Sequence, residues 1–111
     1  MDRKELINNY KERKITGGVY KIINTKTNMY LLSSAVNLEG ANNRFNFAKA
    51  TGTCIEFKLQ KDWDKYSSEI FIFEIVESIN KKTEQDDKGF AEDVKVLEEM
   101  WREKFGSEKE Y

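Results

Sequence analysis

The sequence contains no histidine and only one cysteine among its 111 residues. The absence of histidine excludes Ser-His and Cys-His catalysis, imidazole metal ligands and the commonest general base, so any chemistry has to use tyrosine, lysine, arginine or carboxylate groups. The single cysteine, Cys54, excludes an internal disulfide and a cysteine cage for zinc, which fits a reducing compartment. Its apolar neighbour Ile55 favours a packed thiol over a nucleophile.

Long hydrophobic runs are also absent. No apolar stretch approaches the roughly 20 residues that a membrane helix needs, and the first five residues lack the apolar segment of a signal peptide. We therefore expect a cytoplasmic protein with no membrane partner and no disulfide partner. A length of 111 residues with 39% hydrophobic content suits one compact core and is too short for two ordinary domains.

The net charge of −1 provides no overall attraction to nucleic acid, but the charge is unevenly distributed. Residues 1–66 hold 12 Lys and Arg against 7 Asp and Glu, a balance of +5, while residues 67–111 hold 7 against 13, a balance of −6. The basic part is suited to facing a phosphate backbone, because the local field matters more than the total. The same pattern also fits an ordinary solvated surface, so both interpretations stay open.

The stretch from Gly17 to Ser34 predicts a β-hairpin. Its first arm is rich in β-branched and aromatic residues, its second arm runs from Met29 to Leu32, and the polar run between them contains asparagines suited to turns. Each arm carries one tyrosine, Tyr20 and Tyr30. Pairing of the arms is expected to bring the two phenols near each other.

Helices are predicted on both sides of the hairpin. Asp2 and Glu5 have the form of a capping box before a basic helix over residues 3–14. After the hairpin, Asn37 is a suitable N-cap and Gly52 a suitable stop for a helix with an apolar stripe, and Thr53 with Glu56 predicts a second capping box. The stripes of these two later helices contain Leu38, Ala41, Phe45 and Ala48, then Ile55, Leu59, Trp63 and Tyr66.

The last third of the chain predicts a strand, a loop and a long helix. Residues 70–76 are apolar on both alternating faces except at Glu74, as expected of a largely covered strand, and residues 78–89 have the mixed polarity of a mobile surface loop. An apolar stripe from Phe90 to Phe105 predicts a helix against the sheet, with Glu98 half-exposed at its margin. The fold class is α+β, with a small three-stranded, mostly antiparallel sheet flanked by helices.

The ordered set of motifs resembles the GIY-YIG nuclease superfamily. Residues 18–20, Gly-Val-Tyr, look like the GIY element, and Tyr30-Leu31-Leu32 followed by two serines stands where YIG-Ser is expected. The run from Leu59 to Glu77 is similar to the family's second helix and third strand, and Glu98 with Trp101 to its closing helix. On this resemblance, residues 17–105 form a GIY-YIG-like domain, residues 1–16 an N-terminal helical extension and residues 106–111 a C-terminal tail.

The resemblance implies metal-assisted hydrolysis of phosphodiesters in nucleic acid. Carried over position by position, Tyr20 is the residue that orients or deprotonates the attacking water, Tyr30 supports it, and Glu98 binds a divalent cation. If the site is active, the cofactor is Mg²⁺ or Mn²⁺, since such ions prefer oxygen ligands and offset the charge that develops on the phosphate. No other cofactor is expected.

The sequence departs from the family's pattern at its catalytic positions. The YIG glycine is Leu32, the helix arginine is Ala41, the polar residue four positions later is Phe45, and the glycine after the second helix is Ser67. Loss of a phosphate-stabilising cation typically costs orders of magnitude in rate. Arg44, about 60° around the same helix from Ala41, is the one candidate substitute.

Three hypotheses follow. The leading one is a GIY-YIG-like domain that is inactive or strongly impaired as a nuclease and acts as a binding module for DNA or RNA. The second is an active metal-dependent DNA endonuclease that uses Tyr20, Arg44 and Glu98. The third is a protein-interaction or regulatory domain with no role on nucleic acid, which the acidic second part of the chain favours.

Overall fold

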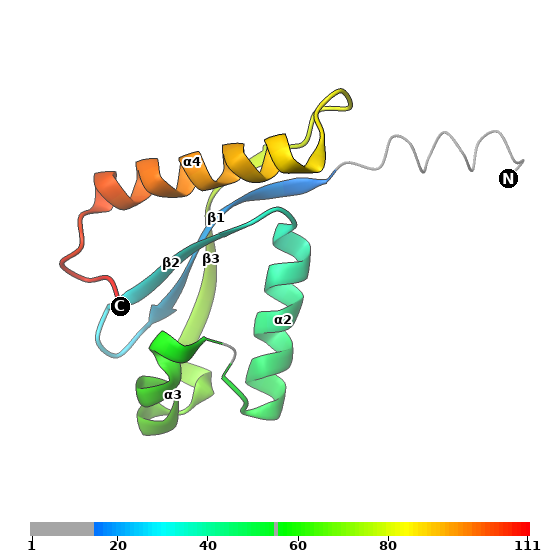
Figure 1. Ribbon diagram of the computed structural model, residues 1–111. Helices are drawn as coiled ribbons and strands as arrows, with labels where there is room; N and C mark the ends of the chain where they lie inside the picture. Colours follow the sequence, from blue (N-terminus) through cyan, green and yellow to red (C-terminus); the bar gives the residue numbers. More distant parts are fainter. Residues whose placement is uncertain (1–14, 55) are drawn as a thin grey trace, which may run out of the picture.

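The computed structural model describes residues 15–54 and 56–111 of the chain. In this part, the antiparallel strands β1 (Thr16–Asn24), β2 (Tyr30–Ala35) and β3 (Phe71–Asn80) form one sheet in the order β2-β1-β3. The helices are α2 (Leu38–Thr51), α3 (Gln60–Tyr66) and α4 (Asp87–Phe105), and Figure 1 shows α4 across one end of the sheet, away from α2 and α3. The α+β class and the order of these elements are confirmed. The helix predicted over residues 3–14 lies outside the described residues.

The hairpin forms as predicted, but its register separates the two tyrosines. Tyr20 pairs with Ser33, and Ile23 pairs with Tyr30. Because side chains alternate along a strand, Tyr20 and Tyr30 point to opposite faces of the sheet. The expectation that their phenols lie near each other is therefore wrong, because Tyr30 is three positions along β2 from Ser33, the partner of Tyr20, and an odd offset reverses the face.

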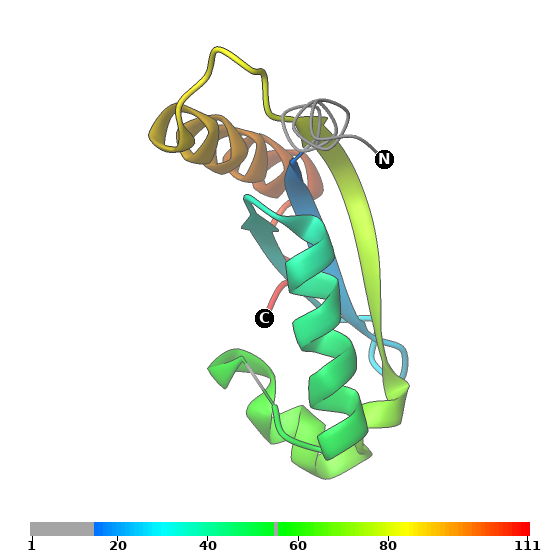
Figure 2. The same cartoon turned by 90° about the vertical axis from the view of Figure 1, so that its right-hand side faces the viewer.

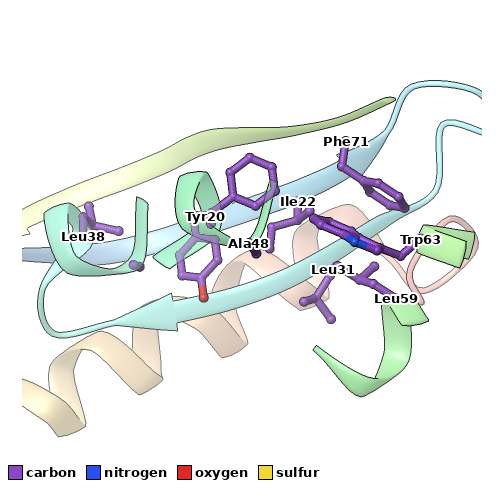
Figure 3. Close-up of a cluster of buried hydrophobic side chains, with 10 residues drawn as sticks. Tyr20, Ile22, Leu31, Leu38, Ala48, Leu59, Trp63 and Phe71 are labelled. Carbon is purple, nitrogen blue, oxygen red and sulfur yellow. The ribbon is translucent and has the colours of Figure 1, made fainter. Parts of the chain in front are cut away.

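The main core lies between the sheet and helices α2 and α3 (Figure 3). Its buried members come from all three strands, from α2 and α3 and from the short turn before α3, and they include an aromatic group in which the rings of Trp63 and Phe71 stack at 4.9 Å. The buried residues of this cluster are Tyr20, Ile22, Leu31, Leu38, Ala41, Phe45, Ala48, Leu59, Trp63 and Phe71. The predicted apolar stripe of α2 is thus its buried side, and Tyr20 is part of the hydrophobic core.

The predicted ends of α2 are confirmed. The Asn37 side chain accepts a hydrogen bond from the Gly40 N–H at 3.1 Å, and Gly52 closes the helix at φ 73°, in the left-handed region that glycine tolerates. The capping box predicted at Thr53 does not start α3. Glu56 is extended and precedes a 3-10 turn (Phe57–Leu59) that leads into the helix, while Ile55 of the predicted stripe lies outside the described residues. The Trp63 indole N–H donates to the Gly52 carbonyl, and this bond packs α3 back against the end of α2.

A second, smaller core lies on the opposite face, under α4. Val19, Tyr30 and Leu32 are buried there, and Leu97 and Trp101 of α4 pack against them. The predicted stripe of α4 therefore faces the sheet, although Phe105 at its end is 38% exposed. Glu98, expected half in and half out, is only 8% exposed.

β3 is an edge strand, which corrects the expectation that it is largely covered. Phe71 is its one buried residue, and Ile72 and Ile75 are 44% and 52% exposed. Figure 2 shows the strand along the outer side of the sheet, with β1 between it and β2. The apolar pattern was misleading because the helices pack mainly over β1 and β2, so β3 is only partly covered on either face: Phe73 packs against the main core and Val76 against the smaller one.

The connection between β3 and α4 is shorter than the predicted loop over residues 78–89. β3 continues to Asn80, and α4 begins at Asp87, because the Asp86 side chain accepts a hydrogen bond from the Gly89 N–H at 2.7 Å and caps the helix one turn before the apolar stripe. None of the helices in the described part of the chain is long and apolar enough to cross a membrane.

Candidate functional site

Glu98 lies at the centre of a polar cluster between α4 and β2. Its Oε1 accepts a hydrogen bond from the Ser34 hydroxyl at 2.5 Å, and its Oε2 accepts one from Arg102 at 2.8 Å. The ammonium group of Lys95 lies 3.6 Å from Oε1. Burial alone raises the pKa of Glu98, but the bonds from Ser34 and Arg102 and the charges of Lys95 and Arg102 outweigh it and hold the pKa below its ordinary value. The carboxylate is therefore ionised and fully partnered.

Arg102 links Glu98 to two other parts of the chain. Its Nε donates to the Glu110 carboxylate at 2.8 Å, and its Nη2 donates to the Leu32 carbonyl at 3.2 Å. Hydrogen bonds to Glu110 and Glu98 raise the pKa of the guanidinium above its ordinary value despite partial burial. The side chain keeps 39% of its surface exposed. Arg102 thus holds α4, β2 and the C-terminal residues together and still faces solvent.

The surroundings of Glu98 do not fit a divalent cation. Mg²⁺ in proteins is held by one or two carboxylates with substrate phosphate and water, and a second positive charge next to the ligand opposes its binding. Here both carboxylate oxygens already accept hydrogen bonds, and two cationic side chains, Lys95 and Arg102, flank them. In residues 15–54 and 56–111, no three Cys, Asp or Glu side chains group closely enough to share a metal ion.

Tyr20, the candidate water-orienting residue, packs inside the main core. It is 5% exposed, and its ring stacks on Phe73 with a centroid distance of 4.7 Å. Figure 3 shows its ring between β1 and β2 on the side of α2, near Leu38 and Ala48. The side chain therefore lies on the opposite face of the sheet from α4, which carries Glu98.

Tyr30, its candidate partner, binds the C-terminal residues. Its hydroxyl donates to the Gly106 carbonyl at 3.3 Å, its ring meets Phe105 edge-on at 6.0 Å, and the Lys21 ammonium lies 4.6 Å from the ring centroid. Burial first, and then the charge of Glu110, raise the pKa of the Tyr30 phenol against the opposing charge of Arg102. A raised pKa makes the phenol a poorer source of a phenolate at neutral pH.

Three of the four positions that depart from the family's pattern are buried and apolar, whereas the fourth, Ser67, is exposed and ends α3 with φ 78°. Leu32 is 3% exposed under α4, and Ala41 and Phe45 are each 3% exposed under α2. Phe45 packs against the rings of Trp63 and Phe73. Arg44 is exposed on α2, whose packed side lies on the face opposite α4, so the structure does not pair it with Glu98.

Sequence reasoning missed the other members of the polar cluster: Ser34 and Arg102, which bind Glu98, and Glu110, which binds Arg102. One signal was present: Glu98 and Arg102 are four positions apart on a predicted helix, the spacing of a favourable ion pair. Ser34 is 64 positions from Glu98 and Glu110 lies beyond the helix, so no local spacing indicated them. Cys54 is half-buried and donates to the Glu56 carbonyl, and burial raises the pKa of its thiol, which agrees with a packed role.

Comparison with known proteins identifies the fold. No protein-family model matches the chain, and no curated protein matches its sequence. Among solved structures, a mutant of the catalytic domain of the intron endonuclease I-TevI superposes with a TM-score of 0.62 at 21% identity, covering 87% of this chain and 92% of that one. A second structure, of the catalytic domain of the homing endonuclease I-TevI, has a TM-score of 0.56 at 24% identity and covers 85% and 96%. The chain therefore has the GIY-YIG-like fold of the I-TevI catalytic domain.

Proposed function

We propose that the chain is a GIY-YIG-like domain that binds nucleic acid and is inactive or strongly impaired as a nuclease. The observation that carries the proposal is the state of Glu98. Its carboxylate is engaged by Ser34 and Arg102 and lies beside Lys95, where the resemblance implies a free metal ligand. A divalent cation at this carboxylate would compete with two charge-assisted hydrogen bonds and would lie beside two positive side chains, whose repulsion opposes its binding.

The positions of the other candidate residues also support the proposed loss of nuclease activity. Tyr20 belongs to the hydrophobic core, and the position of the helix arginine is Ala41, also in that core. Leu32 fills the space under α4 where the resemblance implies a glycine. A phosphate near Glu98 therefore has neither the water-orienting phenol nor the helix cation that hydrolysis requires in the family.

Binding to nucleic acid is supported by cations on the side of α4 next to β2. Lys88, Lys95 and Arg102 recur at seven-residue intervals, about two helical turns, and therefore share one side of the helix. Arg102 contacts Leu32 on this side, which places the row beside the strand. A row of cations along one side of a helix is suited to a phosphate backbone. The structural neighbours are endonuclease catalytic domains, a class of protein that acts on nucleic acid.

The direct test combines binding and cleavage. Labelled single-stranded, duplex and branched DNA would be titrated with the protein in increasing salt, and then incubated with Mg²⁺ or Mn²⁺. We expect binding that weakens linearly on a logarithmic salt scale, and no cleavage. Metal-dependent cleavage that Glu98→Ala abolishes would contradict the loss of activity. The absence of binding at low salt to all three DNA forms would contradict the binding role.

One observation favours a second candidate function, that of a protein-interaction domain. β3 presents an open edge with exposed Ile72 and Ile75, and an extended segment of another protein can pair with such an edge. Ile75→Lys is expected to leave the fold intact, since the side chain is 52% exposed, and to weaken any partner that pairs there. Pull-down with wild type and Ile75→Lys, combined with the DNA titration, separates the two functions.

A further inference from the structure

Arg102 uses only some of its hydrogen-bond donors within the protein. Guanidinium carries five N–H donors, and three of them are used here, by Glu110, Glu98 and the Leu32 carbonyl. Two N–H donors remain on the two terminal nitrogens, and 39% of the side chain is exposed. In contrast, the side chains of Glu98 and Glu110 are only 11% and 12% exposed. The arginine therefore presents the solvent-facing part of this cluster, with its charge offset by two carboxylates.

The carboxylate of Glu110 is brought to Arg102 by the C-terminal strap, residues 106–111. The strap runs back beside β2, where the Tyr30 N–H donates to the Lys109 carbonyl and the Tyr111 N–H donates to the Tyr30 carbonyl, both at 2.9 Å. Figure 1 shows the strap descending from the end of α4 to the end of the hairpin. These bonds pair the strap with the edge of β2 and set Glu110 beside Arg102.

We propose that Arg102 is the residue of this domain that binds a phosphodiester of the nucleic-acid backbone, and that Glu110 occupies it in the free protein. This inference rests on the proposed binding function and extends it. A carboxylate and a phosphate both match the fork of a guanidinium group, so Glu110 and a phosphate compete for the same donors. Release of Glu110 frees the Nε–H and brings three donors to the ligand, while Glu98 keeps Arg102 oriented.

The position of Arg102 suits this role. It is a solvent-facing cation of α4 within the Glu98 cluster, whereas the buried Ala41 belongs to α2 on the other face of the sheet. Lys95, about two helical turns away on the same side of α4, carries a point charge that is 68% exposed and adds attraction without the geometry of a fork. The C-terminal strap consequently tunes affinity by shielding the strongest phosphate-binding group.

The test measures binding of a fluorescein-labelled DNA duplex of about 20 base pairs at about 50 mM salt by fluorescence anisotropy. Glu110→Gln keeps the shape of the side chain and removes its charge. Glu108→Gln is the matched control, since Glu108 is an exposed glutamate of the same strap with the same charge change. We expect Glu110→Gln to tighten binding roughly threefold to tenfold, and Glu108→Gln to change it by less than about twofold.

Arg102 is tested in both backgrounds. Arg102→Lys keeps the charge and loses the fork, and is expected to weaken binding about fivefold in the wild type. Combined with Glu110→Gln, it is expected to remove the gain in affinity. Arg102→Ala is expected to lower the slope of log affinity against log salt by about one, a change that a purely structural residue does not produce. Thermal unfolding of each variant reports whether it is folded.

Different results would overturn the binding function and the proposed roles of Arg102 and Glu110. If the wild type binds DNA and Arg102→Ala binds it with the same affinity and salt slope, the role of Arg102 is overturned and the binding function stands. If Glu110→Gln and Glu108→Gln tighten binding equally, competition by the strap is overturned. If neither the wild type nor Glu110→Gln binds the duplex, both the binding function and this inference are overturned.

Discussion

Glu98 illustrates how one buried carboxylate connects stability to the chemistry of the site. It receives the Ser34 hydroxyl from β2 and the Arg102 guanidinium from its own helix. These bonds offset the cost of burying the charge, and they also occupy the oxygens that a metal ion would need. The same contacts that hold α4 on the hairpin therefore account for the proposed loss of nuclease activity.

The low pKa of Glu98 predicts a specific pH dependence of stability. The unfolded chain takes up a proton near the ordinary value of 4.5, while the folded protein resists protonation until lower pH. The contribution of Glu98 to the free energy of unfolding is therefore complete above about pH 4.5, and it is lost as the pH falls through the pKa of the folded protein. Glu98→Gln is expected to lose about 1–3 kcal/mol at neutral pH and to flatten this decline. Urea unfolding between pH 3 and 7 measures both.

Glu99→Gln is the matched control for this prediction, because Glu99 is the adjacent residue on α4 and is exposed. It is expected to change stability by less than about 0.5 kcal/mol and to keep the pH profile of the wild type. Identical profiles for Glu98→Gln and the wild type would mean that Ser34 and Arg102 do not hold the ionised carboxylate.

The pairing of β1 with β3 depends on a backbone feature at the start of the GIY-like motif. The pairing of β1 with β3 shifts register between Val19 and Tyr20, where β3 contributes an extra residue. Just before this bulge, Gly18 has φ +151°, a conformation that other residues rarely adopt. The motif glycine therefore has a structural reason to be present that is independent of catalysis.

Gly18→Ala is predicted to destabilise the protein strongly. A Cβ at this position would lie 2.1 Å from the Glu77 carbonyl oxygen, against backbone that cannot rotate away cheaply. We expect a loss of about 2–4 kcal/mol, measured by urea unfolding. Gly40→Ala is the contrasting substitution, because its Cβ would meet only Asn37 at 3.4 Å inside α2, and it is expected to stabilise by about 0.5–1 kcal/mol. A Gly18→Ala protein as stable as the wild type would contradict the bulge geometry.

A buried polar contact joins three segments that are distant in the sequence: the end of β1, α3 and the C-terminal residues. Asn24 at the end of β1 is fully buried and donates to the Tyr111 hydroxyl at 2.9 Å, and that hydroxyl donates to Asp62 of α3 at 2.6 Å. The side-chain oxygen Oδ1 of Asn24 accepts hydrogen bonds from the N–H groups of Lys26 and Thr27 in the hairpin turn. The last two residues of the C-terminal strap are thereby held in place, Glu110 by Arg102 and Tyr111 by Asn24 and Asp62.

Tyr111→Phe is predicted to destabilise the protein by removing the hydroxyl from this polar contact. It removes two hydrogen bonds and is expected to cost about 1–2 kcal/mol of unfolding free energy. Burial first, and then the Asp62 carboxylate, raise the pKa of Tyr111 to about 12. Because the unfolded phenol ionises near 10.0, the wild type loses this part of its stability as pH rises from about 10 to 12, and the Phe variant does not.

Tyr66→Phe serves as the control for this alkaline loss, because the Tyr66 ring lies under the Lys65 ammonium at 5.1 Å and is outside the Asn24 contact. The difference in unfolding free energy between wild type and each variant, followed by circular dichroism from pH 8 to 12, is the relevant quantity. A difference for Tyr111→Phe that stays constant across this range would contradict the raised pKa.

Much of the fold could be predicted from local sequence signals. The Asn37 cap, the Gly52 stop and the polar hairpin turn each depend on residues a few positions apart, and the structure confirms them. The apolar stripes of α2 and α4 correctly identified the sides that face the sheet, since helical periodicity reports burial directly. Motif order was sufficient to predict the GIY-YIG-like fold.

The neighbours of each site residue depended on how the elements pack. Strand order makes β1 central and β3 an edge, and strand register turns Tyr20 and Tyr30 to opposite faces of the sheet. The placement of α4 over β1 and β2 brings Glu98 to Ser34. Hydrogen bonds between residues 64 positions apart leave no local spacing to detect. Sequence pattern therefore specified the elements, whereas packing between distant segments set the partners, and with them the charge and exposure of Glu98 and Arg102.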